Sequence, residues 1–196
     1  MQSRCPWVTQ DPQYIAYHDT QWGRPVTDSR ELFEKLCLDG QQAGLSWLTI
    51  LKRSDGYRRA FANFDPQQIA RFGAEDVERL RQDSGIIRNR LKIESIIKNA
   101  RAYLAMEAEG IDFATFLWSF VGGKVQINHW QSVREAPTSS PESDAMSRAL
   151  KQRGFNFVGT TICYAFMQAV GMVNDHELGC PCHAQCVALA KEKQLT

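Results

Sequence analysis

The sequence predicts an all-α protein, and three observations support this. Apolar residues recur at helical spacing in several stretches, for example at Leu32 and Leu36. Capping residues mark the starts of such stretches, as where Asp28 is followed three residues later by Glu31. No stretch alternates apolar and polar residues for long enough to indicate a sheet. A length of 196 residues without an internal repeat favours one helical domain over residues 1–196.

Most of the predicted helices have a clear start or stop signal. The first begins after Asp28 and ends at Gly40, and Ser46 caps the second. Asp65 and Pro66 form an N-cap followed by proline at the first helical position. Further helices are expected over residues 75–82, from shortly after residue 85 to about 110, and over 113–120, 144–153 and 160–170.

Two segments lack a helical pattern. Residues 123–142 contain Pro137 and Pro141 and are predicted to be an irregular connection. Residues 1–27 show no helical periodicity but are rich in aromatic side chains. Such a segment is not expected to be a loose tail, so another part of the chain must hold it in place.

Composition limits the classes of protein to consider. A formal net charge of +1 means that any nucleic-acid binding must come from a local patch. The apolar runs are too short for a membrane span, and the first residues lack the apolar core of a signal peptide. We therefore expect a cytoplasmic protein without a membrane partner. Six cysteines then indicate buried thiols or metal ligands rather than disulfides.

The most informative stretch is Cys37–Trp47, Cys-Leu-Asp-Gly-Gln-Gln-Ala-Gly-Leu-Ser-Trp. It is predicted to be a tight turn between two helices, where glycines let another molecule approach the backbone. Asp39 offers an acceptor for N–H groups, and Trp47 offers a flat π surface. Together these groups suit a cationic heterocycle.

A second candidate turn lies at Gly85, where one helix stops and a long one follows. Residues 85–101 contain five positive side chains and one negative, which gives a local net charge of +4. Amides at a glycine turn and a helix N-terminus can bind phosphate, and Arg88, Arg90 and Lys92 add attraction for DNA. Two helices with a basic exposed face would give the same pattern, so this signal is weak by itself.

Four residues at the two ends of the chain have side chains that bind zinc: Cys5, His18, His176 and Cys180. The spacing His-x3-Cys lets the second pair converge within one turn, whereas the first pair depends on the fold. The alternative is an ordinary thiol and a hydrogen-bonded histidine, and spacing alone does not decide between them. Nearby, Cys182, His183 and Cys186 are either alternative ligands or part of a solvated tail, and we favour the tail.

The stretch Cys37–Trp47 closely resembles the signature of the 3-methyladenine DNA glycosylase I family, bacterial enzymes that remove N3-methylated adenine from DNA. The family usually has glutamate where this chain has Asp39. The resemblance extends from Cys5 to Cys180 and implies a helix-hairpin-helix glycosylase-like bundle. It also makes the Gly85 turn a credible DNA-binding hairpin.

The resemblance further implies a structural zinc that joins the two ends of the chain. Its four ligands match Cys5, His18, His176 and Cys180. One Zn²⁺ per chain would then join residues 1–27 to residues 172–186, an arrangement that we call the zinc clasp. A zinc with four protein ligands has no open position for a reacting water, so a catalytic zinc is not expected. The chain also lacks the His-x-Glu of nucleobase deaminases.

An enzyme that acts on a base must take it out of the stack, which requires a pocket and a wedge. Trp47 and Tyr17 are expected to stack on the base. Leu45, beside Gly44, is the wedge candidate, and the alternative is that Leu45 is the first core residue of the next helix. The outer pocket walls would be Trp7, Tyr14 and Trp22. The alternative for these three is an ordinary core position, because an aromatic stripe is more often core.

The implied activity is base excision without strand cleavage. The bond to 3-methyladenine is weak because this base is already a cation, so protonation by an aspartate is unnecessary. Asp112 reads as an N-cap, and no lysine nucleophile is indicated. The implied partner is alkylated double-stranded DNA, bound by a bacterial, cytoplasmic monomer. The alternatives are a zinc-structured module that binds DNA damage without catalysis and a zinc enzyme that acts on small molecules.

Overall fold

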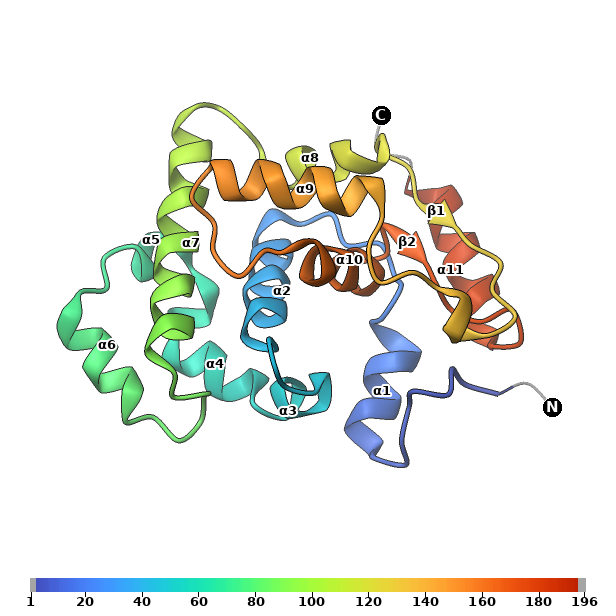
Figure 1. Ribbon diagram of the computed structural model, residues 1–196, viewed down its shortest axis with the longest axis horizontal. Coiled ribbons are helices and arrows are strands. Elements are labelled where there is room, and N and C mark those ends of the chain that lie inside the picture. The colour runs from blue at the N-terminus through green and yellow to red at the C-terminus, as the bar shows by residue number, and fades with distance from the viewer. Residues whose placement is uncertain (1–2, 194–196) are drawn as a thin grey trace.

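The computed structural model describes residues 3–193, and it is mainly helical, as predicted (Figure 1). The helices are α1 (Pro12–Thr20), α2 (Ser29–Gln41), α3 (Trp47–Lys52), α4 (Ser54–Ala60), α5 (Pro66–Ile69), α6 (Ala74–Arg81), α7 (Arg90–Ala108), α8 (Phe113–Trp118), α9 (Pro141–Gln152), α10 (Thr160–Ala169) and α11 (Pro181–Glu192). Single 3₁₀ turns lie at Ala62–Phe64, Ser119–Val121 and Val133–Glu135, and the strands are β1 (Gln126–Ile127) and β2 (Val173–Asn174).

Helix α2 is the central element, and Figure 1 shows it between α7 and α10. It packs against both of these helices and against α8. Its N-terminus is fixed by Asp28, whose carboxylate accepts the amide of Glu31 at 2.9 Å. The apolar stripe that includes Leu32, Phe33 and Leu36 is buried in the main core. Burial of each such side chain contributes about 1.5–3 kcal/mol. The polar end of α2 is thereby held at a fixed place at the edge of this core.

In the N-terminal half of the chain, one helix was not predicted and one helix boundary differs from the prediction. Residues 1–27 contain α1, because Asp11 accepts the amides of Gln13 and Tyr14 and Pro12 occupies the first turn. Helix α2 continues past Gly40 instead of ending there. A Cβ at this glycine would lie 3.1 Å from the Cβ of Phe157, so close packing explains the glycine.

Two further differences lie in the second half of the chain. Helix α9 begins at Pro141 rather than at residue 144, because the Ser140 hydroxyl caps it by accepting the amide of Ser143. The irregular connection contains β1, which pairs in parallel with β2 at Gln126 and Val173. Two residues per strand are too few to give a period-two pattern in the sequence.

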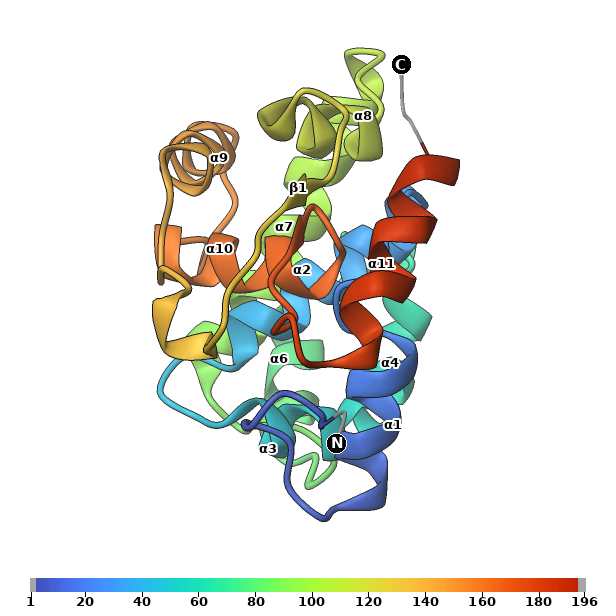
Figure 2. The ribbon, with the colours of Figure 1, turned by 90° about the vertical axis from the view of Figure 1, so that its right-hand side faces the viewer.

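The prediction of a solvated tail at Cys182, His183 and Cys186 is wrong. All three residues lie on α11 and are buried. The imidazole of His183 is hydrogen-bonded to the carbonyl of Asn128 at 2.8 Å. Cys182 packs in a second apolar cluster together with Cys5 and other residues near the N-terminus. Figure 2 shows α11 on the same side of the molecule as the N-terminal segment.

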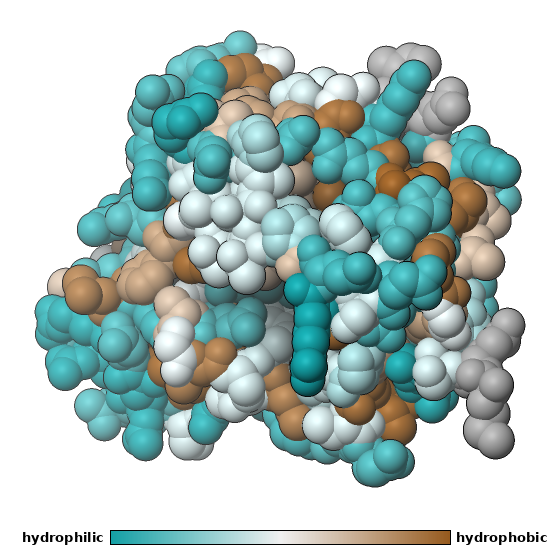
Figure 3. Space-filling model, turned by 45° about the vertical axis from the view of Figure 1, so that its right-hand side comes forward, coloured by the Kyte–Doolittle hydropathy of each residue, from teal (hydrophilic) through white to brown (hydrophobic). Residues whose placement is uncertain are grey.

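The surface is mixed in character. In the view of Figure 3, hydrophobic residues form separate patches among hydrophilic ones. Within residues 3–193, no helix has the length and apolar content needed to cross a membrane.

Candidate functional site

Four buried side chains from the two ends of the chain converge on one point. These are Cys5, His18, His176 and Cys180. The facing atoms are 3.5 Å apart for Cys5 Sγ and His176 Nδ1, 3.6 Å for Cys180 Sγ and His18 Nε2, and 3.7 Å for Cys180 Sγ and His176 Nδ1. Tetrahedral zinc with ordinary bond lengths places sulfur and nitrogen ligands about 3.6 Å apart. The cluster therefore has the ligand types and spacing to hold a metal.

The ring nitrogens of His18 and His176 that face away from the cluster are also hydrogen-bonded. Nδ1 of His18 lies 2.7 Å from the carboxylate of Asp19, and Nε2 of His176 lies 2.8 Å from the carbonyl of Trp22. Such outer partners orient metal-binding imidazoles. The hydrogen bond with Cys5, and then those with His176 and His18, lower the pKa of the Cys180 thiol. A thiolate, the form that binds metal, is thus favoured at Cys180.

The metal-ligand cluster lies directly beside a group of aromatic side chains. The ring of Trp7 is centred 5.2 Å from that of His18, and Trp22 is centred 4.6 Å from His176. Tyr17 immediately precedes His18 in α1. Whatever fixes the cluster therefore also fixes these aromatic side chains.

A cavity of about 200 Å³ lies between α1, α2, α3 and α10. It is lined by all five aromatic residues that the sequence analysis names, together with Asp39. The full lining consists of Trp7, Tyr14, Tyr17, Trp22, Lys35, Asp39, Gln42, Trp47, Val133, Ala165, Gln168 and Ala169. We call this cavity the base pocket. A larger hollow of about 550 Å³ next to the metal-ligand cluster has no Trp, Tyr or Phe in its lining, so it offers no such ring to stack on a base.

The base pocket contains two buried polar atoms without a partner. Among the side chains of residues 3–193, only Oδ2 of Asp39 and Nε1 of Trp47 are in this state. Buried polar groups are normally hydrogen-bonded, and each one left unpaired costs about 1–3 kcal/mol. The Asp39 side chain is only 3% exposed. An unpaired acceptor and an unpaired donor in one pocket indicate a site for a ligand that has both kinds of group.

The other oxygen of Asp39 is bonded to a residue that the sequence analysis missed. Nζ of Lys35 donates to Oδ1 of Asp39 at 2.7 Å and lies 3.3 Å from the centre of the Trp47 ring. Burial raises the pKa of Asp39, while Lys35 lowers it. Burial, and then the charge of Asp39, raise the pKa of Tyr17 well above its ordinary value, so this phenol stays neutral. The sequence did contain a signal for this ion pair, because Lys35 and Asp39 are four residues apart and so lie one turn apart on a helix.

The tip of the turn between α2 and α3 is exposed. Gly44 has a φ of +79°, and no atom lies within 4 Å of the place where its Cβ would be. Leu45 is 38% exposed, and the next residue, Ser46, caps α3 by accepting the amide of Thr49 at 3.2 Å. Leu45 thus precedes the helix and is not one of its core residues. The core alternative is wrong, and the wedge remains a prediction.

The Gly85 turn is rigid and closely packed. Its amide donates to Asp83 at 2.8 Å, so this N–H group is not free for a phosphate. A Cβ on Gly56 would lie 2.2 Å from the carbonyl oxygen of Gly85, so the two backbones touch. The amide of Ile87 donates to the Tyr57 hydroxyl at 3.2 Å, and that hydroxyl donates to Gln41 at the end of α2. The hairpin is therefore tied to the turn that follows α2.

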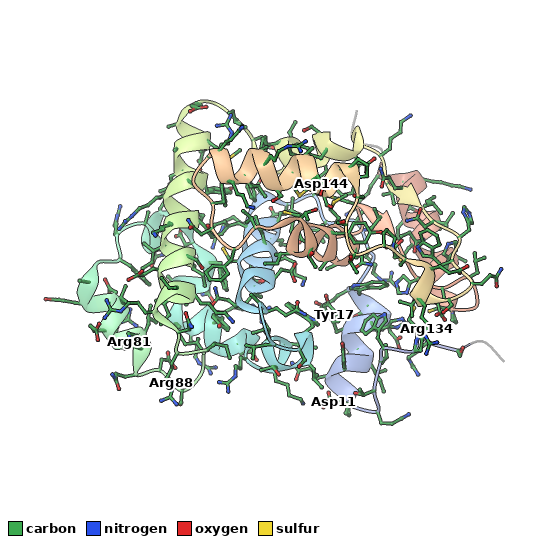
Figure 4. The ribbon with its side chains drawn as sticks, in the orientation of Figure 1. Asp11, Tyr17, Arg81, Arg88, Arg134 and Asp144 are labelled. Atoms are coloured by element: carbon green, nitrogen blue, oxygen red, sulfur yellow. The ribbon has the colours of Figure 1, made fainter. Side chains whose placement is uncertain are left out.

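The three basic residues of the hairpin have different environments. Arg88 is exposed, and Figure 4 shows it at the α6–α7 connection, with α3 and α4 between it and Tyr17 in this view. Arg90 is exposed but pairs with Glu78 at 2.5 Å. Lys92 corrects the prediction of a phosphate contact, because it is only 8% exposed. Its ammonium donates to two carbonyls of the α2–α3 turn, those of Gln41 at 2.9 Å and Ala43 at 2.7 Å.

Asp112 has a local structural role. Its carboxylate accepts the amide of Thr115 at 3.0 Å and caps α8. It also accepts a hydrogen bond from the Ser29 hydroxyl at 3.1 Å. The prediction that Asp112 is an N-cap is confirmed.

Comparison with known proteins identifies the family. The family model for methyladenine glycosylase matches residues 7–183. DNA-3-methyladenine glycosylase 1 of Escherichia coli is 61% identical over 180 residues, which cover 92% of this chain and 96% of that protein. DNA-3-methyladenine glycosylase of Haemophilus influenzae is 54% identical over 182 residues, which cover 93% of this chain and 98% of the relative.

Solved structures agree with this result. A crystal structure of 3-methyladenine DNA glycosylase I superposes with a TM-score of 0.92 at 63% identity, and the match covers 92% of this chain and all of the other. A structure of 3-methyladenine DNA glycosylase I from Staphylococcus aureus, which addresses its recognition of 3-methyladenine, superposes with a TM-score of 0.88 at 39% identity. This match covers 92% of this chain and 96% of the other. The chain therefore belongs to the methyladenine glycosylase family.

Proposed function

We propose that this protein is a monofunctional DNA glycosylase that flips 3-methyladenine out of alkylated DNA and hydrolyses its N-glycosidic bond. The observation that carries the proposal is the pair of unpaired buried atoms, Oδ2 of Asp39 and Nε1 of Trp47, in an aromatic-lined pocket. Membership of the methyladenine glycosylase family supports the same activity.

The base pocket offers what a methylated adenine needs. The exocyclic amino group of adenine is a donor for Oδ2 of Asp39, and a ring nitrogen is an acceptor for Nε1 of Trp47. The rings of Trp47 and Tyr17 both line the pocket, and each offers a π face on which a flat cation can stack. The carboxylate of Asp39 adds the opposite charge. An unmethylated, neutral adenine would gain less from both the charge and the π faces.

The reaction needs little acid–base chemistry because the leaving group is already charged. When the C1′–N9 bond breaks, its electron pair stays on the base, which leaves as neutral 3-methyladenine. A water oxygen bonds to C1′, and its proton passes to solvent. The role of the protein is then to hold the base outside the stack and to favour bond cleavage electrostatically. We retain the prediction that the protein has no lyase activity.

DNA binding is assigned to two exposed features. Leu45, with Gly44 behind it, would fill the gap that the flipped base leaves. Arg88 and the N-terminus of α7, which follow the Gly85 turn, would hold the phosphate backbone. Arg90 is a weaker candidate because Glu78 already neutralises it. The partner is double-stranded alkylated DNA, bound by a monomer in the bacterial cytoplasm.

We assign the metal as Zn²⁺, one per chain, held by the two thiols and two imidazoles of the cluster. When bound, zinc would supply structural cross-linking in a closed set of four protein ligands. The residues that hold it would thereby fix α1 and the aromatic walls of the base pocket against α11. Residues 1–196 would act as one glycosylase domain.

The direct test is to incubate the protein with alkylated duplex DNA and identify the bases released into solution. The proposal predicts free 3-methyladenine and no strand cleavage. Tight binding to alkylated duplex with no base released would favour the alternative, a module that binds damage without catalysis. Activity on small molecules that does not require DNA and that a chelator abolishes would favour a zinc enzyme of another kind.

A further inference from the structure

The base pocket already contains a positive charge. The ammonium of Lys35 lies 2.7 Å from Oδ1 of Asp39, 3.3 Å from the centre of the Trp47 ring and 5.7 Å from that of Tyr17. These are the groups to which the proposed function assigns the charge and π contacts of the methylated base. In the structure, the Lys35 ammonium therefore makes the contacts that a cationic base would make.

We propose that Lys35 is a specificity-determining residue whose ammonium occupies the cation site of the empty base pocket and yields it only to a positively charged base. The proposal rests on the proposed function, because it takes the methylated base as the ligand. A neutral base offers Asp39 no charge in exchange, so it does not displace the ammonium. A cationic base replaces one positive charge with another.

The structure offers a second position for the displaced side chain. Lys35 also lines a neighbouring cavity of about 350 Å³, which is bordered by Glu31 and Glu34. Glu34 already pairs with Arg58 at 3.0 Å, which leaves Glu31 as the new partner. Glu31 lies one helical turn before Lys35, and Asp39 lies one turn after it. On a helix, an ion pair is more favourable when the acidic residue precedes the lysine, as Glu31 does, than when it follows, as Asp39 does.

The chemistry of the reaction would reverse the exchange. While the methylated base is bound, its charge balances Asp39, and Lys35 balances Glu31. After the C1′–N9 bond breaks, the electron pair of that bond makes the base neutral, and water supplies the oxygen at C1′ and releases a proton to solvent. Asp39 then lacks a positive partner inside the pocket. The return of the Lys35 ammonium to Asp39 and to the face of Trp47 would expel the neutral product.

A purely structural role for Lys35 makes a different prediction. If Lys35 only kept the buried carboxylate of Asp39 ionised, its removal would favour the protonated carboxyl. That carboxyl is a poorer acceptor for the amino group of the base, so the pocket would bind the neutral product less well or equally well. If Lys35 competes with the base, its removal makes the pocket bind the neutral product more tightly. The two roles thus differ in the sign of the effect on product affinity.

The test measures the dissociation constant of free, neutral 3-methyladenine by tryptophan fluorescence in four proteins: wild type, Lys35→Met, Lys35→Arg and Lys52→Met. Lys52 is the matched control because it is also an ion-paired lysine, bonded to Asp11 on the surface. Lys35→Met lacks the ammonium that competes with the base for Asp39 and for the face of Trp47. The dissociation constant of 3-methyladenine should therefore be about tenfold lower for this variant than for the wild type. Lys35→Arg and the control should stay within about twofold of the wild type, an interval well below that tenfold step.

The turnover of alkylated DNA gives a second readout. For Lys35→Met, the multiple-turnover rate should fall further below the wild-type value than the single-turnover rate does, because the product leaves slowly. Lys35→Gln serves as a second uncharged variant if methionine disturbs packing, which thermal unfolding would reveal. Unchanged or weaker binding of free 3-methyladenine in a folded uncharged variant would overturn the inference. Failure of the wild type to release 3-methyladenine from DNA would instead refute the proposed function, and the binding measurement would still decide the role of Lys35.

Discussion

The metal-ligand cluster and the base pocket lie side by side but differ in whether their buried polar atoms are hydrogen-bonded. In the cluster, both outer ring nitrogens are hydrogen-bonded, to Asp19 and to the carbonyl of Trp22. In the base pocket, one oxygen of Asp39 and Nε1 of Trp47 have no partner. Unpaired buried groups cost stability, so they persist where a ligand completes them. The comparison indicates that the metal-ligand cluster stabilises the fold and that the base pocket binds a ligand.

The two regions are coupled through the N-terminal segment. Cys5 and Trp7 are two residues apart, and Tyr17 and His18 are adjacent. In each pair, one member belongs to the cluster and the other lines the pocket. The cluster should therefore be needed for both stability and base binding, whereas the pocket should be needed for base binding alone. Variants of each region can separate these expectations.

The largest effect is expected from loss of a metal ligand. Cys5→Ala should lower the zinc content to near zero and the free energy of unfolding by on the order of 5 kcal/mol, because loss of a structural metal is among the most destabilising single changes. Elemental analysis and urea unfolding measure the two quantities. Cys186→Ala is the control, since this buried thiol lies on α11 outside the four ligands. Full zinc content in Cys5→Ala would refute the cluster assignment.

Next in size is the effect of removing the main stacking surface. Trp47→Ala should slow excision about 10- to 100-fold, because stacking on an aromatic side chain contributes about 1–3 kcal/mol per base. Trp47→Phe retains a smaller aromatic face but lacks Nε1, so its excision rate should lie between those of the wild type and Trp47→Ala. Single-turnover excision measures the effect, and thermal unfolding checks the fold. Equal rates in all three proteins would show that the base stacks elsewhere.

The pH dependence should separate function from stability at Asp39. Burial raises the pKa of Asp39 above its ordinary value of 3.8. As pH falls through the raised pKa, the carboxyl becomes neutral and loses its attraction for a cationic base, so excision should fall with a midpoint above 3.8.

The contribution of this carboxyl to stability should move in the opposite direction. A folded-state pKa above the unfolded one adds stability that is fully present below the unfolded pKa and is lost as pH rises through the folded pKa. The measurement compares the wild type with Asp39→Asn in unfolding experiments over the pH range in which zinc stays bound. An activity midpoint at or below 3.8 would contradict this account.

The smallest effect is expected at the hairpin. Arg88→Gln should weaken binding to any duplex a few-fold and reduce the slope of log K against log salt by about one, as for the loss of one phosphate contact. Arg90→Gln should do less, because Arg90 is paired with Glu78. Arg148→Gln, an exposed arginine on α9, is the control. A slope for Arg88→Gln equal to that of the control would place the DNA elsewhere.

The sequence predicts best those elements whose residues act locally. Asp28 and Asp112 cap helices as expected, and the apolar stripe of α2 packs in the core. Helix α1 was missed because its inward residues, Tyr17 and His18, line a pocket and a metal-ligand cluster instead of an apolar core. A hydrophobic period cannot report a helix whose buried face is polar and aromatic.

The site was predictable as a set of residues but not as a set of partners. The five aromatic residues predicted for the site and Asp39 meet in one pocket, yet the hydrogen bond from Lys35 to Asp39 depends on how far α2 is buried there. Lys92 looked like a DNA contact because basic residues near a turn are usually exposed. Its burial against the carbonyls of Gln41 and Ala43 depends on the packing of α7 against α2, which no local pattern reports.

We infer that the carboxylate of Asp39 contacts the base and contributes little to the stability of the fold. The single-turnover rate of 3-methyladenine release from alkylated duplex by Asp39→Asn, at saturating enzyme, tests this inference. We expect a rate about 100-fold lower than that of the wild type, as for loss of a preorganised charge. Stability should be near native because Lys35 can turn to Glu31. Asp39→Glu, which restores the residue usual in the family, should be tolerated. A rate for Asp39→Asn equal to that of the wild type would show that the charge of Asp39 does not act on the base.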